Sequence, residues 1–174
     1  MIKDRSERGG MIHKYVFGDP IETDAVVREI GESCWSDGLL HKEGNAFYYE
    51  LQPDEIVYGL GENVRGMNKR GWRYVSNCSD NPNHCEHTNS LYGAHNFIMA
   101  GDGTDNTFGV FVDIPGKITF DVGYTNTDQL VILPEDENYK IYLIEGNSYQ
   151  EVVREFRELI GRSYIAPRWA LGYG

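Results

Sequence analysis

Short runs of alternating apolar and polar residues, separated by clusters of turn-forming residues, constrain the fold of this chain more than any other feature. In residues 118–122, Ile118, Phe120 and Val122 alternate with Thr119 and Asp121, the period-two pattern of a strand with one buried face. Comparable strand signals occupy residues 46–51, 107–113, 130–133 and 140–144. Short strands repeated in this way predict an all-β sandwich of antiparallel strands.

Turn-forming residues separate these runs, at residues 102–106, 113–116 and 124–128. The chain has 20 glycines, which supply the positive φ angles that tight turns require. Residues 21–30 fit either a strand or a short helix, so the sequence leaves that segment open. We assign residues 11–146 to the sandwich domain.

One helix is expected near the carboxyl end, within residues 147–161. Ser148 and Glu151 have the spacing of a capping box, in which each side chain accepts a hydrogen bond from the backbone N–H of the other residue. Gly161 occupies the position at which a helix ends. One apolar face is formed by residues at helical spacing, namely Val152, Val153, Phe156, Leu159 and Ile160.

The two ends of the chain carry different signals. Residues 1–10 are charged and polar, which predicts a disordered lead-in with no secretory signal. The last residues, Trp-Ala-Leu-Gly-Tyr-Gly after Arg168, predict the opening of a buried strand, so we expect the chain to be cut from a longer protein. The three cysteines, Cys34, Cys78 and Cys85, are too few for a disulfide scaffold, and we expect a cytoplasmic protein.

The charge balance narrows the class of ligand. The chain has 16 basic and 27 acidic residues and a formal net charge of −11. Binding to phosphate backbones needs clustered Lys and Arg, so we expect no nucleic-acid partner. No apolar run approaches the roughly 20 residues of a membrane-spanning helix. A neutral or weakly polar ligand fits this acidic charge balance better than a nucleic acid or an anionic membrane does.

Two short motifs resemble ligand-binding sequences, but we interpret both as structural. Gly59-Leu60-Gly61 begins like a dinucleotide-binding loop but lacks the third glycine and the βαβ context, and it predicts a turn at the end of a strand. The segment 84–87, His-Cys-Glu-His, lies near Cys78 and His95. It lacks the paired spacing of zinc ligands, and we expect loop residues there with no metal or cofactor.

Residues 64–96 carry the most functional information. This stretch is rich in Asn, His, Asp, Gly and aromatic residues, and loops of that length in small domains are usually functional or disordered. The aromatic residues, among them Trp72 and Tyr92, argue against disorder. Amides and a carboxylate, Asn77 and Asp80, bond well to vicinal hydroxyls, and aromatic rings stack on sugar C–H faces. The stretch therefore fits either a sugar-binding loop or a structural loop packed on the sandwich.

Several motifs in order resemble the amino-terminal domain of glycoside hydrolase family 31. They occupy residues 57–62, 68–71, 91–97, 108–113, 120–123, 160–162 and 166–173. The resemblance implies a galactose-mutarotase-like β-sandwich followed by a (β/α)₈ barrel, whose first strand would begin within residues 162–174. It also implies a retaining α-glucosidase or related enzyme, with two catalytic aspartates on a barrel that is absent from this chain.

The resemblance further implies a site residue and partners. In the family, an acid on a sandwich loop contacts the sugar at subsite −1, and the matching position here is Asp80, in the motif that begins at Asn77. The residue types of the loop add Trp72 and Tyr92 as further expected substrate-binding residues. The expected partners are an α-glucoside or related oligosaccharide and the catalytic barrel, and the isolated chain should be inactive. Self-association is also expected, through the apolar surface that the barrel would cover.

Two alternatives from other functional classes stay open. One is a free-standing carbohydrate-binding module that uses the same loop. The other is a mutarotase-like epimerase, which would need a His and a Glu directed at an anomeric centre, such as His95 or His87 with Glu62.

Overall fold

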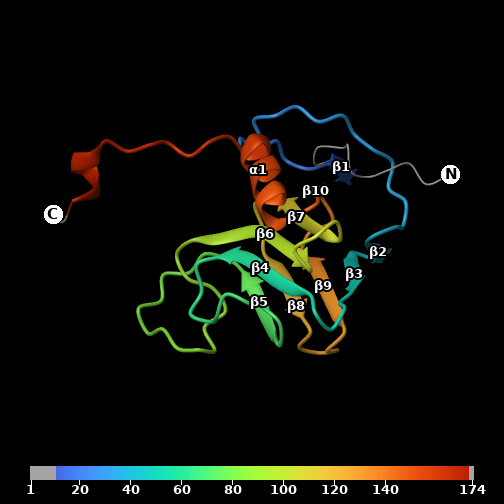
Figure 1. Ribbon diagram of the computed structural model, residues 1–174, viewed down its shortest axis with the longest axis horizontal. Helices are drawn as coiled ribbons and strands as arrows, with labels where there is room; N and C mark the ends of the chain where they lie inside the picture. The colour runs from blue at the N-terminus through green and yellow to red at the C-terminus, as the bar shows by residue number, and fades with distance from the viewer. Residues whose placement is uncertain (1–10, 173–174) are drawn as a thin grey trace.

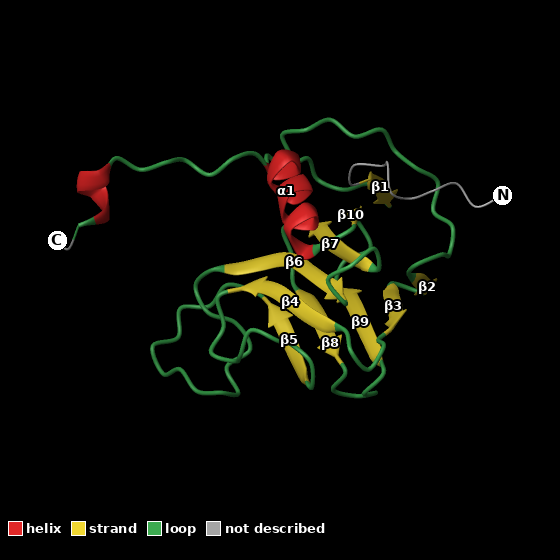
Figure 2. Cartoon of the chain, viewed as in Figure 1, coloured by secondary structure: helices red, strands yellow, loops and turns green. Residues whose placement is uncertain are grey.

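Ten strands in two antiparallel sheets form the core of the protein, shown by a computed structural model that describes residues 11–172 (Figures 1 and 2). Sheet A has the order β1 (Met11–Phe17), β10 (Tyr139–Gly146), β7 (Thr107–Asp113), β6 (Ala94–Gly101) and β4 (Ile56–Gly61). Sheet B has the order β2 (His41–Glu43), β3 (Ala46–Glu50), β9 (Gln129–Pro134), β8 (Ile118–Val122) and β5 (Trp72–Ser76). The predicted all-β sandwich is confirmed, and each of the five predicted strand runs coincides with one of the strands β3, β7, β8, β9 and β10.

The apolar residues of the predicted strands meet between the two sheets. In β8, Ile118, Phe120 and Val122 are fully buried, and Phe120 lies opposite Ile132 of β9. Residues of sheet A, among them Val110, complete the same buried cluster. Burial of an apolar side chain of this size stabilises a fold by about 1.5–3 kcal/mol. The apolar residues buried between the sheets therefore hold the two sheets together.

Helix α1 (Tyr149–Ile160) begins and ends where the sequence predicts. The Ser148 hydroxyl accepts a hydrogen bond from the N–H of Glu151 at 3.2 Å. The Glu151 carboxylate accepts from the N–H of Asn147 at 2.8 Å, one residue before the expected partner. The capping interaction therefore also holds the turn that leads into the helix.

The apolar face of α1 lies on the outer face of sheet A, so the domain has three layers (Figure 1). Val152 and Leu159 are fully buried there. The ring of Phe156 stacks on that of Phe97 with the centroids 3.7 Å apart. A Cβ added at Gly109 of β7 would lie 2.7 Å from Val152, so the small residue allows the helix to approach the sheet.

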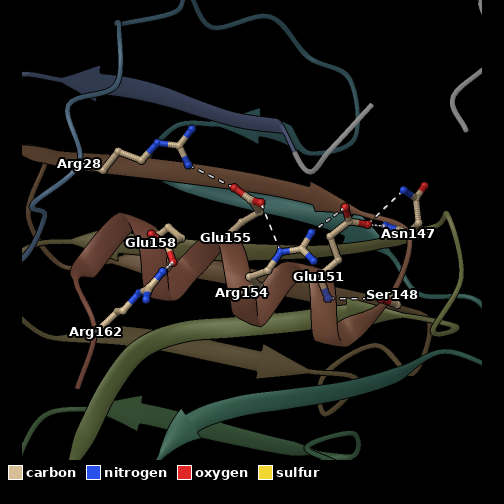
Figure 3. Close-up of polar contacts among 8 residues, drawn as sticks. All are labelled: Arg28, Asn147, Ser148, Glu151, Arg154, Glu155, Glu158 and Arg162. Atoms are coloured by element: carbon tan, nitrogen blue, oxygen red, sulfur yellow. Dashed lines mark hydrogen bonds and ion pairs between the residues drawn. The ribbon is translucent and has the colours of Figure 1, made fainter. Parts of the chain in front are cut away.

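Residues 21–30 form neither a strand nor a helix, which settles the segment that the sequence left open. The N–H groups of Val27 and Arg28 both donate to the Leu159 carbonyl, at 2.9 and 3.1 Å. The segment uses these donors to satisfy the end of α1, where carbonyls otherwise lack partners. Figure 3 shows Arg28 also paired with Glu155 of the helix, at 3.1 Å.

The expected strand at the carboxyl end is wrong. Residues Arg168–Leu171 form a 3₁₀ turn, η2, in which the Ala170 N–H donates to the Pro167 carbonyl at 2.9 Å. No strand in residues 11–172 pairs with this segment, so its backbone forms local hydrogen bonds instead. Trp169 is 83% exposed. The predicted lead-in at residues 1–10 and the last two residues lie outside the described part.

Candidate functional site

Two connections flank β5: residues 62–71 join β4 to the start of β5, and residues 77–93 join the end of β5 to β6 (Figure 1). The loop expected over residues 64–96 is therefore wrong in part, because β5 interrupts it. Trp72 and Tyr74 point to one face of β5 and alternate with the exposed Arg73. Tyr74 is only 2% exposed and belongs to the core. The inward-facing positions of this strand are Trp72, Tyr74 and the buried Ser76, with no aliphatic residue among them, which concealed the period-two pattern.

A β-bulge at the end of β4 brings the two connections together. The φ angles of Gly59, Leu60 and Gly61 are 120°, 67° and 67°, and the pairing with β6 shifts register between the two glycines. The predicted strand-end turn is thus a bulge within the strand. A Cβ at Gly61 would lie 2.2 Å from the carbonyl oxygen of Gly93. The N–H of Glu62 donates to that oxygen at 2.8 Å, so the glycine permits this close approach.

At the base of the 77–93 loop, hydrogen bonds join the arm that leaves β5 to the arm that returns to β6. The Ser79 N–H donates to the Leu91 carbonyl at 3.1 Å, and the Asn77 N–H donates to the Ser90 hydroxyl at 3.4 Å. Leu91 is 7% exposed, so it anchors the returning arm of the loop in the interior.

The four predicted site residues have different surroundings. Asp80 is exposed, and its carboxylate makes no hydrogen bond or ion pair with any residue of the described range 11–172. Tyr92 is 51% exposed, with its ring centroid 5.9 Å from that of His84. Trp72 is half-buried, and the Arg65 guanidinium lies 4.3 Å from its ring centroid. One face of the Trp72 ring is therefore already occupied.

Of these four residues, only Asn77 lines the hollow of about 450 Å³ on the 77–93 loop. The hollow is formed mainly by side-chain amides and hydroxyls, among them Asn77, Asn81, Asn83, Asn89, Ser79 and Thr88. Its lining within the described residues includes no Asp, Glu, Lys or Arg. Groups that both donate and accept hydrogen bonds suit a neutral polyhydroxylated molecule.

The loop also contains a polarised thiol. The Thr88 hydroxyl, the backbone N–H of His87 and the charge of Arg65 lower the pKa of Cys85. Among residues 11–172, no group of three or more His, Cys, Asp or Glu is placed to hold a metal ion. Of the residues considered for an epimerase, Glu62 accepts a hydrogen bond from the Gly93 N–H at 3.1 Å, and both His87 and His95 are exposed.

A second hollow, of about 410 Å³, lies at the opposite end of the strands. Its lining includes Asp54, Asp102 and the buried Glu55. The Tyr49 hydroxyl donates to Glu55 at 2.5 Å, and burial followed by this contact raises the pKa of Tyr49. The sequence analysis missed this hollow, although two acidic turns, at residues 52–55 and 102–106, form part of its lining.

This sandwich and its outlying loop match a known family. Residues 5–121 match the family described as the glycosyl hydrolase 31 N-terminal galactose mutarotase-like domain, and the chain belongs to that family. The resemblance read from the sequence motifs is confirmed. No helix in the described residues is long and apolar enough to cross a membrane.

The relatives are named as glycosidases. An alpha-glucosidase of Saccharolobus solfataricus is 27% identical over 93% of this chain, and an alpha-xylosidase of Lactiplantibacillus pentosus is 30% identical over 68% of it. The chain spans only 24% and 15% of the length of these two proteins. Among solved structures, a family 31 dextranase from Flavobacterium johnsoniae in complex with isomaltotriose superposes with a TM-score of 0.65. That match has 26% identity and covers 80% of this chain and 17% of the dextranase chain.

Proposed function

We propose that this chain is the amino-terminal domain of a retaining α-glucosidase-type glycoside hydrolase and that its 77–93 loop contacts the sugar at subsite −1. The proposed substrate is an α-glucoside or a related oligosaccharide, because the relatives include both α-glucosidases and an α-xylosidase. The two catalytic carboxylates would belong to a barrel domain, and a retaining enzyme holds them about 5–5.5 Å apart.

The observation that carries this proposal is the unpartnered carboxylate of Asp80 on an exposed loop next to a neutral, hydrogen-bonding hollow. Several other aspartates are partnered: Asp121 accepts hydrogen bonds from Arg73 and Thr125, and Asp102 accepts from Thr104. The exposed Asp54 also has no partner among the described residues, but it lines the acidic hollow. An ionised carboxylate with both oxygens free can accept hydrogen bonds from two neighbouring hydroxyl groups. Asp80 therefore has the capacity that a sugar contact requires.

The segment after α1 supports the proposed barrel partner. It extends away from the sandwich on the same side as the 77–93 loop (Figure 1). Four large apolar residues of this segment are 76–91% exposed, namely Tyr164, Ile165, Trp169 and Leu171. Exposed apolar groups gathered in one segment are typical of a surface that another domain covers. We propose that residues 11–146 form the sandwich domain, 147–161 the connecting helix and 162–174 the approach to the barrel.

The test is a titration of the 174-residue chain with maltose and isomaltose, followed by NMR. We expect binding weaker than about 1 mM, since only half of the site is present, with shifts confined to the 77–93 loop. Asp80→Asn should abolish these shifts and change the free energy of unfolding by less than about 0.5 kcal/mol. Asp54→Asn, which alters an exposed aspartate at the other end of the strands, is the matched control. Shifts at the acidic hollow instead of the loop would contradict the proposal.

Two further measurements separate the alternatives. The neutral hollow also suits a free-standing carbohydrate-binding module, and a submillimolar dissociation constant for the chain alone would favour that function. We expect no hydrolysis of a chromogenic α-glucoside by this chain. Turnover that Asp80→Asn abolishes would contradict the assignment of catalysis to a separate barrel.

A further inference from the structure

Arg65 connects three parts of the domain through one side chain. It lies in the 62–71 connection, and its guanidinium carbon is 4.3 Å from the ring centroid of Trp72 and 4.9 Å from that of Tyr74. Because these two rings are on one face of β5, they form a continuous aromatic surface under the guanidinium. Contact with these rings limits the directions in which its N–H groups can point.

Two of those N–H groups are used on backbone carbonyls. Nη1 donates to the Arg73 carbonyl of β5 at 2.7 Å, and Nε donates to the Glu86 carbonyl of the 77–93 loop at 2.8 Å. The planar guanidinium makes both bonds in fixed relative directions. A single residue outside the loop therefore joins the outer part of the loop to a core strand.

The outer part of the loop, residues 80–89, has few other attachments. Its other hydrogen bonds, such as Cys85 N–H to the Thr88 hydroxyl at 3.0 Å and Asn83 N–H to Asn81 at 3.0 Å, stay within the segment. Within the described residues, the bond from Arg65 to Glu86 is the one hydrogen bond that ties residues 80–89 to a residue outside the loop. Among the ring contacts of residues 11–172, only that between His87 and Trp72 joins this segment to the sandwich, with centroids 6.1 Å apart.

We propose that Arg65 is a positioning residue for the sugar-binding loop: it holds residues 80–89, including Asp80, in the conformation that receives the ligand. This proposal rests on the function proposed above. A loop that is ordered before binding avoids the entropy cost of ordering during binding. Loss of the Arg65 contact should therefore weaken sugar binding without removing any group that touches the sugar.

The test measures loop order without any sugar. Backbone order parameters from ¹⁵N relaxation are compared for the wild-type chain, Arg65→Lys and Arg70→Lys. Arg65→Lys keeps a cation near the rings but removes the planar guanidinium that donates to two carbonyls at once. Arg70 is the matched control, since it also donates to backbone carbonyls, those of Gln52 and Glu55 at 2.6 and 3.0 Å, and forms no hydrogen bond or ion pair with the 77–93 loop.

We expect order parameters of about 0.85 for residues 80–89 in the wild type and in Arg70→Lys, and values below about 0.6 in Arg65→Lys. Arg65→Met, which keeps an aliphatic stem over the rings, is the second variant and should show the same loss of order. Unchanged order parameters in both Arg65 variants would overturn the proposal. So would a mobile loop in the wild type, or the same loss of order in Arg70→Lys.

A maltose titration of the same proteins completes the test. We expect Arg65→Lys to weaken binding about tenfold, while it leaves the chemical shifts of strands that do not contact residue 65, such as β10, unchanged. If the wild type binds no sugar, the proposed function fails, but the relaxation data still decide whether Arg65 orders the loop.

Discussion

Two sides of the same sandwich are held in contrasting ways. Helix α1 rests on sheet A through buried apolar side chains such as Val152 and Leu159, while its ion pairs lie at the surface (Figure 3). The side that carries β5 and its two connections is held largely by charged groups that bond to backbone carbonyls or to a buried carboxylate. Lys69 belongs to that side, is only 5% exposed and donates to Asn63 and Gly66 at 2.8 and 2.9 Å.

This difference explains how one small domain can support both a rigid layer and a polar loop. Apolar burial is insensitive to direction and stabilises α1 as a unit. The outer part of the 77–93 loop, residues 80–89, is largely exposed and polar, so it has little apolar surface to bury, and the directional hydrogen bond from Arg65 to Glu86 ties it to the rest of the domain instead. We expect the two sides to respond differently to truncation, to acid and to loss of a cap.

The largest expected effect is on the helix side. Leu159→Ala removes a fully buried side chain between α1 and sheet A, and we expect a loss of about 2–5 kcal/mol in the free energy of unfolding. Urea denaturation measures this loss. Leu171→Ala, at a residue 76% exposed, is the control and should change stability by less than about 0.5 kcal/mol. A loss below about 1 kcal/mol for Leu159→Ala would show that apolar packing does not hold the helix.

Acid should act on the β5 side. Burial opposes ionisation of Asp121, but hydrogen bonds from Thr125, Arg73 and Tyr124 outweigh it and lower the pKa of the carboxyl below its usual 3.8. The ionised form therefore stabilises the fold above about pH 4, and this contribution is lost as the pH falls through the lowered pKa.

Asp121→Asn tests this effect by urea denaturation at several pH values. We expect the variant to lose about 1–3 kcal/mol at pH 7 and to show a flatter decline of stability below pH 4. Asp54→Asn, whose side chain is exposed and makes no bond within the described residues, should keep the wild-type profile. Equal profiles for wild type and Asp121→Asn would contradict the assignment.

The smallest expected change in stability is at the amino-terminal cap of α1. Ser148→Ala removes the acceptor for the Glu151 N–H, and we expect a loss of about 1 kcal/mol, typical of an N-cap. Ser163→Ala, at an exposed position after the helix, is the control for the substitution itself. If both variants are equally stable, the cap contributes nothing beyond apolar packing.

Strands with aliphatic alternation were predictable from sequence, and so was α1, since local patterns suffice for both. The strand β5 was not, because its inward-facing aromatic residues, the half-buried Trp72 and the buried Tyr74, are residue types that also suit a ligand-binding loop. The prediction of a strand after Arg168 was wrong because it treats the apolar residues there as a sign of burial. An apolar run indicates burial only where a partner surface exists, and in the described residues η2 has none.

The candidate site was predictable only in part. Asn77 and Asp80 were identified by motif and residue type, and the structure places both on the exposed loop. Arg65 carried no signal, because its partner Glu86 is 21 residues away and accepts through its backbone carbonyl, which any residue type provides. The neutral hollow likewise depends on how the loop folds back on itself.

Local periodicity, turn residues and the helix cap each depend on residues that are close in sequence. The amino-acid sequence alone therefore predicted a sandwich with one helix and revealed the family resemblance. The β-bulge of β4, the contact of Arg65 with Glu86 and the course of the last residues required the folded chain. Each depends on groups that are distant in sequence and meet only after the sheets have formed, and a hydrogen bond to a backbone carbonyl leaves no trace in residue identity.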